Sequence, residues 1–182
     1  PAEGKYDASA LAQSVIDGGR DSVLLMSYAT DGAAIIEALS AQGFNGIMIG
    51  ADGIADAKFT ESFTDASAVD GLIATRPRPG KESSEKSSFE AAYSAAGGAD
   101  GAIYTGETYD AIKIAAAAVI ADPDDLRASI KKTGTNYSGA SGIHTFDAAG
   151  DVNGAGYEVC QFDGTSFSCP RIWTADGGIS TE

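Results

Sequence analysis

The stretch SVLLMSYATDGAAIIEALSAQGFNGIMIGADG, residues 22–53, decides the fold. It opens with a continuous apolar run at 22–26 and closes with a second at 44–50, each of strand length. Between these runs, Asp31 begins a helical pattern that Gly43 ends. Continuous apolar runs suit strands that are buried on both faces of a parallel sheet, and a helix between two of them makes a βαβ unit. The stretch therefore predicts part of a doubly wound α/β fold.

The flanking sequence extends this pattern on both sides. Asp7 is a good N-cap for a helix over residues 8–16. A short helix around 57–63 then precedes a third apolar strand at 71–75. Helices and strands thus alternate up to residue 75. We predict an α/β protein with Rossmann-like, doubly wound parallel sheets.

A proline-punctuated, polar segment at 76–84 predicts a crossover between two parts of the chain. Beyond it, three helices and three strands are expected. The first helix covers 87–96 and begins with a capping box of Ser87 and Glu90. The second covers 104–121, with an apolar face of Tyr109, Ile112, Ala116 and Val119. The third covers 123–132, with Asp122 as N-cap and Asp125 in the first turn. The strands cover 142–146, 154–162 and 166–173, the last two joined by an Asp163-Gly164 turn.

The two cysteines can be placed on that hairpin. If Phe162 and Phe167 pair across the turn, Cys160 and Cys169 lie opposite each other, close enough for a disulfide. The alternative is two free thiols that align by chance. We favour the disulfide, which implies an oxidising compartment.

Composition excludes several classes of protein. The chain of 182 residues carries 12 Lys and Arg against 26 Asp and Glu, a net charge of −14. That charge argues against nucleic acid or an anionic membrane as a partner. No window of the sequence is apolar for the 18 residues that a membrane span needs. The start at Pro1 shows no signal peptide, which a mature or truncated chain would have lost, and the sequence there resembles the middle of a longer chain.

Few residues suit catalysis, a metal or a cofactor. His144, the single histidine, lies in an alternating run and is expected to be a strand residue with its polar side outward rather than a catalytic group. The cysteines have no CxxC spacing, and neither a phosphate-binding loop nor a dinucleotide-binding glycine motif occurs. We therefore expect no enzyme activity, no metal and no cofactor.

Short motifs along nearly the whole chain resemble one known family. They are Tyr6–Leu11, Val23–Gly32, Gln42–Phe44, Ile49–Gly53, Gly71–Pro77, Tyr109–Ala111 and Thr145–Asp151 with the final hairpin. In this order they resemble the C-terminal half of type I periplasmic binding proteins, in particular the substrate-binding proteins of branched-chain amino acid (leucine, isoleucine, valine) ABC transporters. The resemblance implies two Rossmann-like lobes joined by three crossovers, with residues 1–77 and 156–182 in the second lobe and 78–155 in the first.

The same resemblance implies a set of ligand-binding residues. Asp52 matches an acidic residue that clamps the ligand's α-ammonium group, and Tyr28 matches a tyrosine on the same side of the cleft. Tyr104 matches an aromatic residue of the first lobe, and Ala29 and Thr30 add backbone or hydroxyl contacts. Each has a structural alternative: Asp52 as a helix cap or turn residue, and the tyrosines as packing residues. Because some members have glutamate where this chain has Asp52, the identity of the ligand stays open.

The resemblance implies an exported amino-acid-binding protein that works with an ABC permease in the periplasm, soluble or lipid-anchored through a missing N-terminus. A ligand-sensing receptor or regulator of the same fold, or a small Rossmann-like enzyme, are the alternatives. The family's N-terminal half is absent. We therefore expect that half, or an oligomeric partner, to cover apolar surface on the strand at 23–25 and the helix at 112–119.

Overall fold

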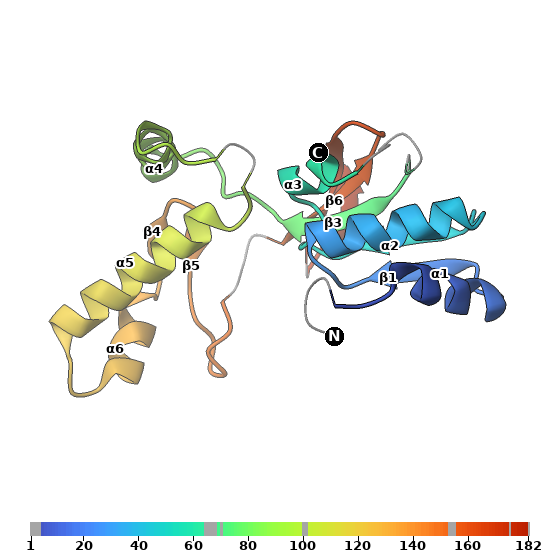
Figure 1. The fold of residues 1–182 in the computed structure, drawn as a ribbon. Helices are drawn as coiled ribbons and strands as arrows, with labels where there is room; N and C mark the ends of the chain where they lie inside the picture. The colour runs from blue at the N-terminus through green and yellow to red at the C-terminus, as the bar shows by residue number, and fades with distance from the viewer. Residues whose placement is uncertain are drawn as a thin grey trace. The chain divides into compact units, whose positions relative to one another are not determined.

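The structure is a computed structural model and describes residues 5–63, 69, 71–99, 102–152, 156–174 and 176–181. The chain divides into two compact units (Figure 1). The sheet unit comprises Pro1–Pro77 and Tyr157–Glu182, and the helical unit comprises Arg78–Gly156. The start of the strand expected at 154–162 lies outside the described residues.

The sheet unit contains a six-stranded mixed sheet in the order β1-β2-β3-β6-β7-β8. Its elements in chain order are α1 (Ala8–Asp17), β1 (Ser22–Leu25), α2 (Ala29–Ala41), β2 (Ile47–Gly50), α3 (Ala57–Glu61), β3 (Ile73–Pro77), β6 (Tyr157–Phe162), β7 (Phe167–Thr174) and β8 (Gly178–Thr181). Strands β1, β2 and β3 are parallel, and β6 joins them antiparallel to β3. The α/β prediction is confirmed, and Asp7 caps α1 as expected by accepting from the Ala10 N–H at 3.0 Å.

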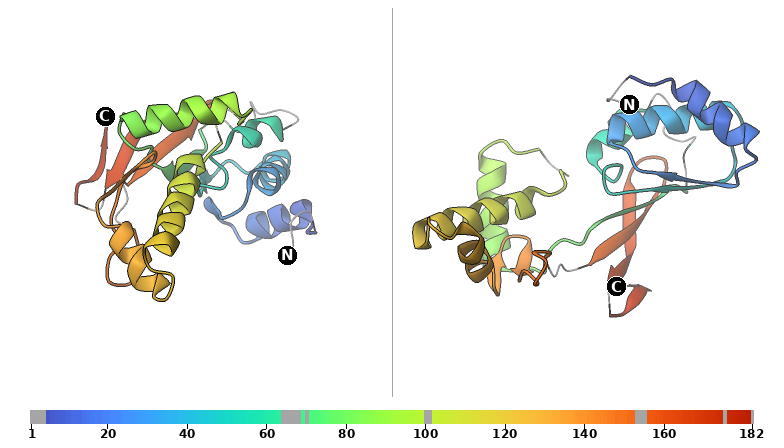
Figure 2. Two further views of the ribbon diagram at one scale, coloured as in Figure 1. Left: turned by 90° about the vertical axis from the view of Figure 1, so that its left-hand side faces the viewer. Right: turned by 90° about the horizontal axis from the view of Figure 1, so that it is seen from below.

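One face of this sheet carries the core of the unit. Leu25 and Phe162 pack there against Ile36 of α2 and Phe59 of α3, all of them buried. Phe59 meets Phe162 edge to face, with 5.6 Å between the ring centroids. Figure 2 shows α1 and α2 on the same side of the sheet. Helices α2 and α3 therefore supply the apolar layer that holds this face of the parallel strands.

The opposite face of the sheet is uncovered in the described part of the chain, which confirms the apolar surface expected on the strand at 23–25. Register places Leu24 beside Ile49, and Tyr157 beside Trp173 and Ile179. The exposed large residues of this face, which we name the open face, are Leu24, Ile47, Ile49, Tyr157, Trp173 and Ile179. Leu24 alone keeps 66% of its surface exposed.

The helical unit consists of α4 (Ser84–Ala95), α5 (Thr105–Ala121), α6 (Leu126–Thr133) and a small hairpin of β4 (Tyr137–Gly139) and β5 (Gly142–His144). Helix α5 packs on α6, where the Ser129 hydroxyl donates to Ala118 O at 2.8 Å. The buried stripe of α5 is Gly106, Asp110, Ile114 and Ala118. The other face of α5, with Tyr109, Ile112, Ala116 and Val119, is exposed, which confirms the apolar surface expected on the helix at 112–119.

Three predicted helix starts are wrong by a few residues. Helix α2 begins at Ala29, so Asp31 lies within its first turn rather than opening it. Ser83 caps α4 by accepting from the Lys86 N–H, ahead of the Ser87 and Glu90 box. Asp125, not Asp122, caps α6 by accepting from the Ala128 N–H. Polar residues that can cap occur on both sides of each start, and the sequence does not rank them.

The disulfide between Cys160 and Cys169 is present, as predicted. It links β6 to β7 next to a register shift between Val159 and Gln161, and Cys160 is buried. The bulge changes the register that the turn sets at Phe162 and Phe167.

Loss of this disulfide should have a measurable cost. Replacing both Cys160 and Cys169 by alanine is expected to lower the free energy of unfolding by about 2–3 kcal/mol, since the bond closes a short loop of the unfolded chain. Urea unfolding of the oxidised protein and the double variant measures the difference. Reduction of the wild type with a thiol should reproduce it. Two titratable thiols in the unfolded, unreduced protein would contradict the disulfide.

Candidate functional site

Two loops leave neighbouring parallel strands at the same edge of the sheet. Strands β1 and β2 end side by side at Leu25 and Gly50, and the Ala51 N–H donates to Leu25 O at 3.0 Å. The segments that follow carry Tyr28 and Asp52. Open α/β sheets bind ligands at the carboxyl ends of their strands, and these loops lie at that edge.

Gly53 lets the two loops touch. A Cβ atom at Gly53 would lie 2.7 Å from Ser27 O and 3.3 Å from Cδ1 of Tyr28. No side chain fits in that space, so the loop of Asp52 rests directly on the loop of Tyr28. The structure therefore brings these two predicted site residues together on adjacent loops.

Helix α2 positions the next three predicted residues. Tyr28 is its N-cap residue and makes no side-chain cap, and 73% of the tyrosine is exposed. Thr30 is also exposed, whereas Ala29 is buried in the core. Tyr28 and Thr30 can thus offer side chains to a ligand, and Ala29 can offer only its backbone.

Asp52 does not act as the cap of the helix that follows it. That cap is Asp56, whose carboxylate accepts from the Lys58 N–H at 2.8 Å at the start of α3. The backbone oxygen of Asp52 accepts from the Ala55 N–H at 3.0 Å, which closes a turn after β2. Asp52 is half-buried in this turn.

Tyr104, the remaining predicted residue, belongs to the helical unit and stands immediately before α5. Its backbone is left-handed, with φ 62° and ψ 12°. This conformation costs a non-glycine residue about 1–2 kcal/mol and often marks functional positions. The side chain is partly exposed.

The structure also reveals a polar cluster that the sequence reading missed. Asp110, only 1% exposed, accepts hydrogen bonds from the Ala140 N–H and the Ser141 N–H, both at 2.8 Å. The Ser141 hydroxyl donates to Oδ2 of Asp110 at 2.7 Å, and Nε2 of His144 lies 3.1 Å from the same oxygen. His144 is a strand residue as expected, but its polar side faces inward, so the outward placement is wrong.

This cluster is not a hydrolytic triad. In a triad, histidine stands between the serine and the aspartate and takes the serine proton. Here one ring nitrogen, Nε2 of His144, lies 2.9 Å from Ser141 Oγ and 3.1 Å from Oδ2 of Asp110, and the Ser141 hydroxyl itself donates to the same Oδ2. His144 therefore does not join the serine to the aspartate through its two ring nitrogens, as the histidine of a triad does.

The hydrogen bonds set the charge state of Asp110. Burial raises the pKa of its carboxyl, but the donors of Ser141, Ala140 and His144 lower the pKa further, and the net result lies below the ordinary aspartate value. A lowered pKa means that the charged carboxylate stabilises the folded state. Its contribution is complete above the pKa of the unfolded chain and is lost as the pH falls through the folded pKa.

We expect Asp110→Asn to lower the free energy of unfolding by about 1–3 kcal/mol at pH 5, because an amide cannot accept from all the donors. The difference between wild type and variant should shrink as the pH is taken from 5 toward 2, because Asp110 itself then becomes protonated. Urea unfolding at several pH values measures this. A difference that stays constant or grows toward acid would contradict the assignment.

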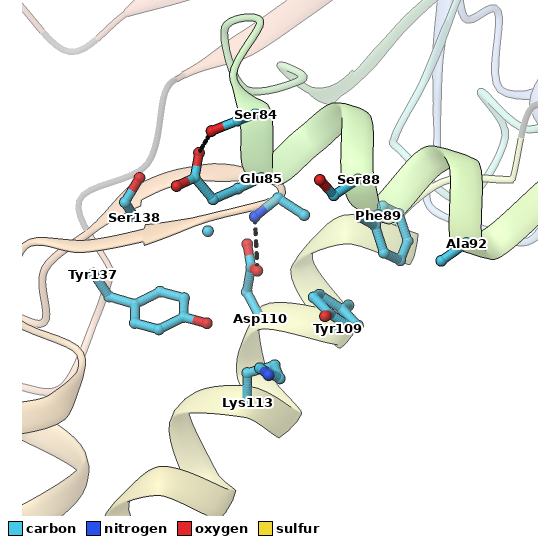
Figure 3. A pocket seen from close by; sticks show the side chains of 12 residues that line it. Ser84, Glu85, Ser88, Phe89, Ala92, Tyr109, Asp110, Lys113, Tyr137 and Ser138 are labelled. Carbon is cyan, nitrogen blue, oxygen red and sulfur yellow. Dashed lines mark hydrogen bonds between the residues drawn. The ribbon is translucent and has the colours of Figure 1, made fainter.

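A cavity of about 370 Å³ lies between α4, α5 and β4 (Figure 3). Aromatic side chains of Phe89, Tyr109 and Tyr137 line it together with Lys113 and Asp110. Figure 3 shows Asp110 turned toward the hairpin, where it accepts from the backbone of Ala140. The Asp110 carboxylate is thus engaged in hydrogen bonds to the backbone of the hairpin turn.

One group of side chains has the composition of a metal site. Among the described residues, Glu158, Cys160 and Cys169 bring their potential ligand atoms within 4.8 Å of one another. Both sulfurs are joined in the disulfide, and a metal needs thiolates. Glu158 also forms a salt bridge with Arg76, with 2.6 Å between Oε2 of Glu158 and Nε of Arg76.

Solved structures share the fold of this chain. A leucine-binding protein of Thermotoga maritima aligns over 95% of the chain and 50% of its own, with 23% identity and a TM-score of 0.78. A branched-chain amino acid transporter substrate-binding protein of Streptococcus pneumoniae, in complex with isoleucine, covers 92% and 48%, with 16% identity and a TM-score of 0.70. A solute-binding protein of R. palustris, in complex with benzoate, covers 100% and 50%, with 15% identity and a TM-score of 0.67.

These similarities confirm the expected fold. The chain has the fold of a type I periplasmic binding protein and spans about half the length of the solved proteins that it matches. Its structural neighbours include substrate-binding proteins of ABC transporters for branched-chain amino acids. No protein-family model and no curated protein matches the sequence. None of the helices in the described residues is long and apolar enough to cross a membrane.

Proposed function

We propose that this chain is part of the substrate-binding component of an ABC transporter and that it binds an amino acid, branched-chain or similar. The observation that carries the proposal is the contact between the loops of Tyr28 and Asp52 at the carboxyl edge of parallel strands. The shared fold with leucine-binding and isoleucine-bound proteins supports it. Residues 1–77 and 156–182 then form the second lobe, and 78–155 belong to the first.

Each proposed contact follows from the chemistry of its side chain. The carboxylate of Asp52 pairs with the ligand's ammonium group, a charge-assisted contact that rejects ligands without an amine. Tyr28 packs its exposed ring on the ligand, while Thr30 offers its hydroxyl and Ala29 its backbone. Tyr104, in the proposed first lobe, offers its aromatic ring to the ligand. The neighbour in complex with benzoate makes the amine the feature that must be tested, because benzoate has none.

Two further proposals concern where the protein works and with which partners. The disulfide supports an exported protein of the periplasm, soluble or anchored by lipid, that delivers its ligand to an ABC permease. The open face supports a second polypeptide portion over the sheet: the N-terminal half of the fold, or an oligomeric partner.

A ligand-sensing receptor domain is the second candidate. Extracellular ligand-binding receptors of Desulfohalobium retbaense and Rhodopseudomonas palustris share the fold, with TM-scores of 0.71 and 0.70. Genes for a permease or for a kinase beside the gene of this protein would separate transport from sensing.

A thermal-shift screen of the common amino acids on the complete binding protein tests the proposal. An amino acid at 100 times its dissociation constant should add about 2.7 kcal/mol of stability. We expect the largest shifts from leucine, isoleucine or valine. A screen in which no amino acid shifts the transition would reject the proposal.

A further inference from the structure

Three segments of the helical unit converge on the turn between β4 and β5. A Cβ atom at Gly80 would lie 2.4 Å from Ser141 O, and one at Gly106 would lie 3.3 Å from Ser141 Cβ. A Cβ at Gly139 would lie 2.3 Å from a carboxylate oxygen of Asp110. The segment at Gly80, the first turn of α5 and the hairpin turn therefore meet with little room for side chains between them.

Asp110 is the polar centre of this junction. Its carboxylate accepts hydrogen bonds from the N–H groups of Ala140 and Ser141 and from the Ser141 hydroxyl, and it also contacts His144 Nε2. It lies on the buried stripe of α5 one turn after Gly106. One carboxylate thus ties the start of α5 to the hairpin turn.

We propose that Asp110 is a positioning residue for ligand binding, which acts through Ser141 and His144 to hold the start of α5, and with it Tyr104, in the binding conformation. The inference rests on the proposed function, because it assigns Tyr104 to the ligand. A left-handed tyrosine persists only where its surroundings fix it. The Thr108 N–H to Tyr104 O bond at 2.9 Å restrains this residue from within the helix, and the Asp110 junction restrains the start of the helix itself.

The junction also predicts how ligand binding depends on pH. The titratable or charged side chains that face Asp110 or line the cavity beside it are His144 and Tyr137 of the hairpin, Tyr109 and Lys113 of α5, and Glu85 of α4. Of these, only His144 lies within hydrogen-bonding distance of Asp110 among the described contacts. Ligand affinity should fall as the pH drops through the lowered pKa of Asp110, because a protonated carboxyl cannot accept from all of its donors. Asp110→Asn should not show this fall.

The test compares Asp110→Asn with Asp147→Asn. Asp147 also accepts from backbone N–H groups, at Gly150 and Asp151, but lies in an exposed loop of the same unit. In the complete binding protein, Asp110→Asn should weaken binding of L-leucine at least tenfold. In the 182-residue chain, it should speed amide hydrogen exchange at 105–108 and at 140–141 at least tenfold. Asp147→Asn should change both measurements less than twofold.

The outcomes separate this inference from the proposed function. If wild type binds leucine and folded Asp110→Asn binds it equally well, the positioning role is wrong even if exchange at 140–141 increases. If wild type binds no amino acid, the proposed function fails, and the exchange at 105–108 alone decides whether Asp110 fixes the start of α5. Should Asp110→Asn not fold, Ser141→Ala replaces it. We then expect at least a threefold loss of affinity and an acid loss of affinity that begins at higher pH, because the Ser141 hydroxyl lowers the pKa of Asp110. An unchanged affinity and pH profile would overturn the role.

Discussion

Asp52→Asn is expected to weaken amino-acid binding by the complete protein by about 2–5 kcal/mol, the usual cost of removing one partner of a buried charge pair. The amide keeps the size of the side chain but cannot neutralise the ligand's ammonium group. Isothermal titration calorimetry with L-leucine measures the loss.

Asp56→Asn is the matched control, because Asp56 lies four residues further on and caps α3. Asparagine caps helices as well as aspartate does, so this variant should bind normally. Equal affinities of wild type, Asp52→Asn and Asp56→Asn would remove Asp52 from the site.

The open face is expected to drive association of the 182-residue chain when it is prepared alone. Leu24 and Ile47 are exposed on neighbouring strands, beside an edge of β1 that pairs with no other described strand. Uncovered apolar faces and open strand edges favour pairing with another chain. Static light scattering should show dimers or larger species, and Leu24→Lys with Ile47→Lys should shift the chain at least tenfold toward monomer.

The added charge needs its own control. Ala34→Lys with Ala41→Lys adds the same two charges at exposed positions of α2, and this variant should associate like wild type. A compact wild-type monomer that binds an amino acid at micromolar concentration, with no second polypeptide, would contradict both the association and the need for a covering half.

Local chemistry made much of the fold predictable. Asp7 caps α1, and Gly134 follows α6 after Lys131 and Lys132, as their preferences require. The hairpin turn at Asp163 aligned Cys160 with Cys169 well enough to predict their bond. These features depend on neighbours in sequence or across one turn, where the pattern of residues is sufficient.

Features that depend on distant packing were not predictable. Helix α5 is rich in alanine and apolar on several sides, so its periodicity did not reveal that Gly106 and Asp110 face inward. His144 alternates like a surface residue, but its side chain turns inward to Asp110, 34 residues away. For the site, the order of motifs placed Tyr28 and Asp52 at strand ends, but the close approach of their two loops depends on the space that Gly53 leaves.

Recognition of the ligand's amine by Asp52 is the step on which the proposed function depends. Calorimetric titration of the complete protein with L-leucine and with 4-methylpentanoate, which has the same carbon skeleton without the amine, measures it. We expect leucine to bind and 4-methylpentanoate to bind at least about 30-fold more weakly, the lower end of what a lost buried charge pair costs. Equal or tighter binding of 4-methylpentanoate would contradict it.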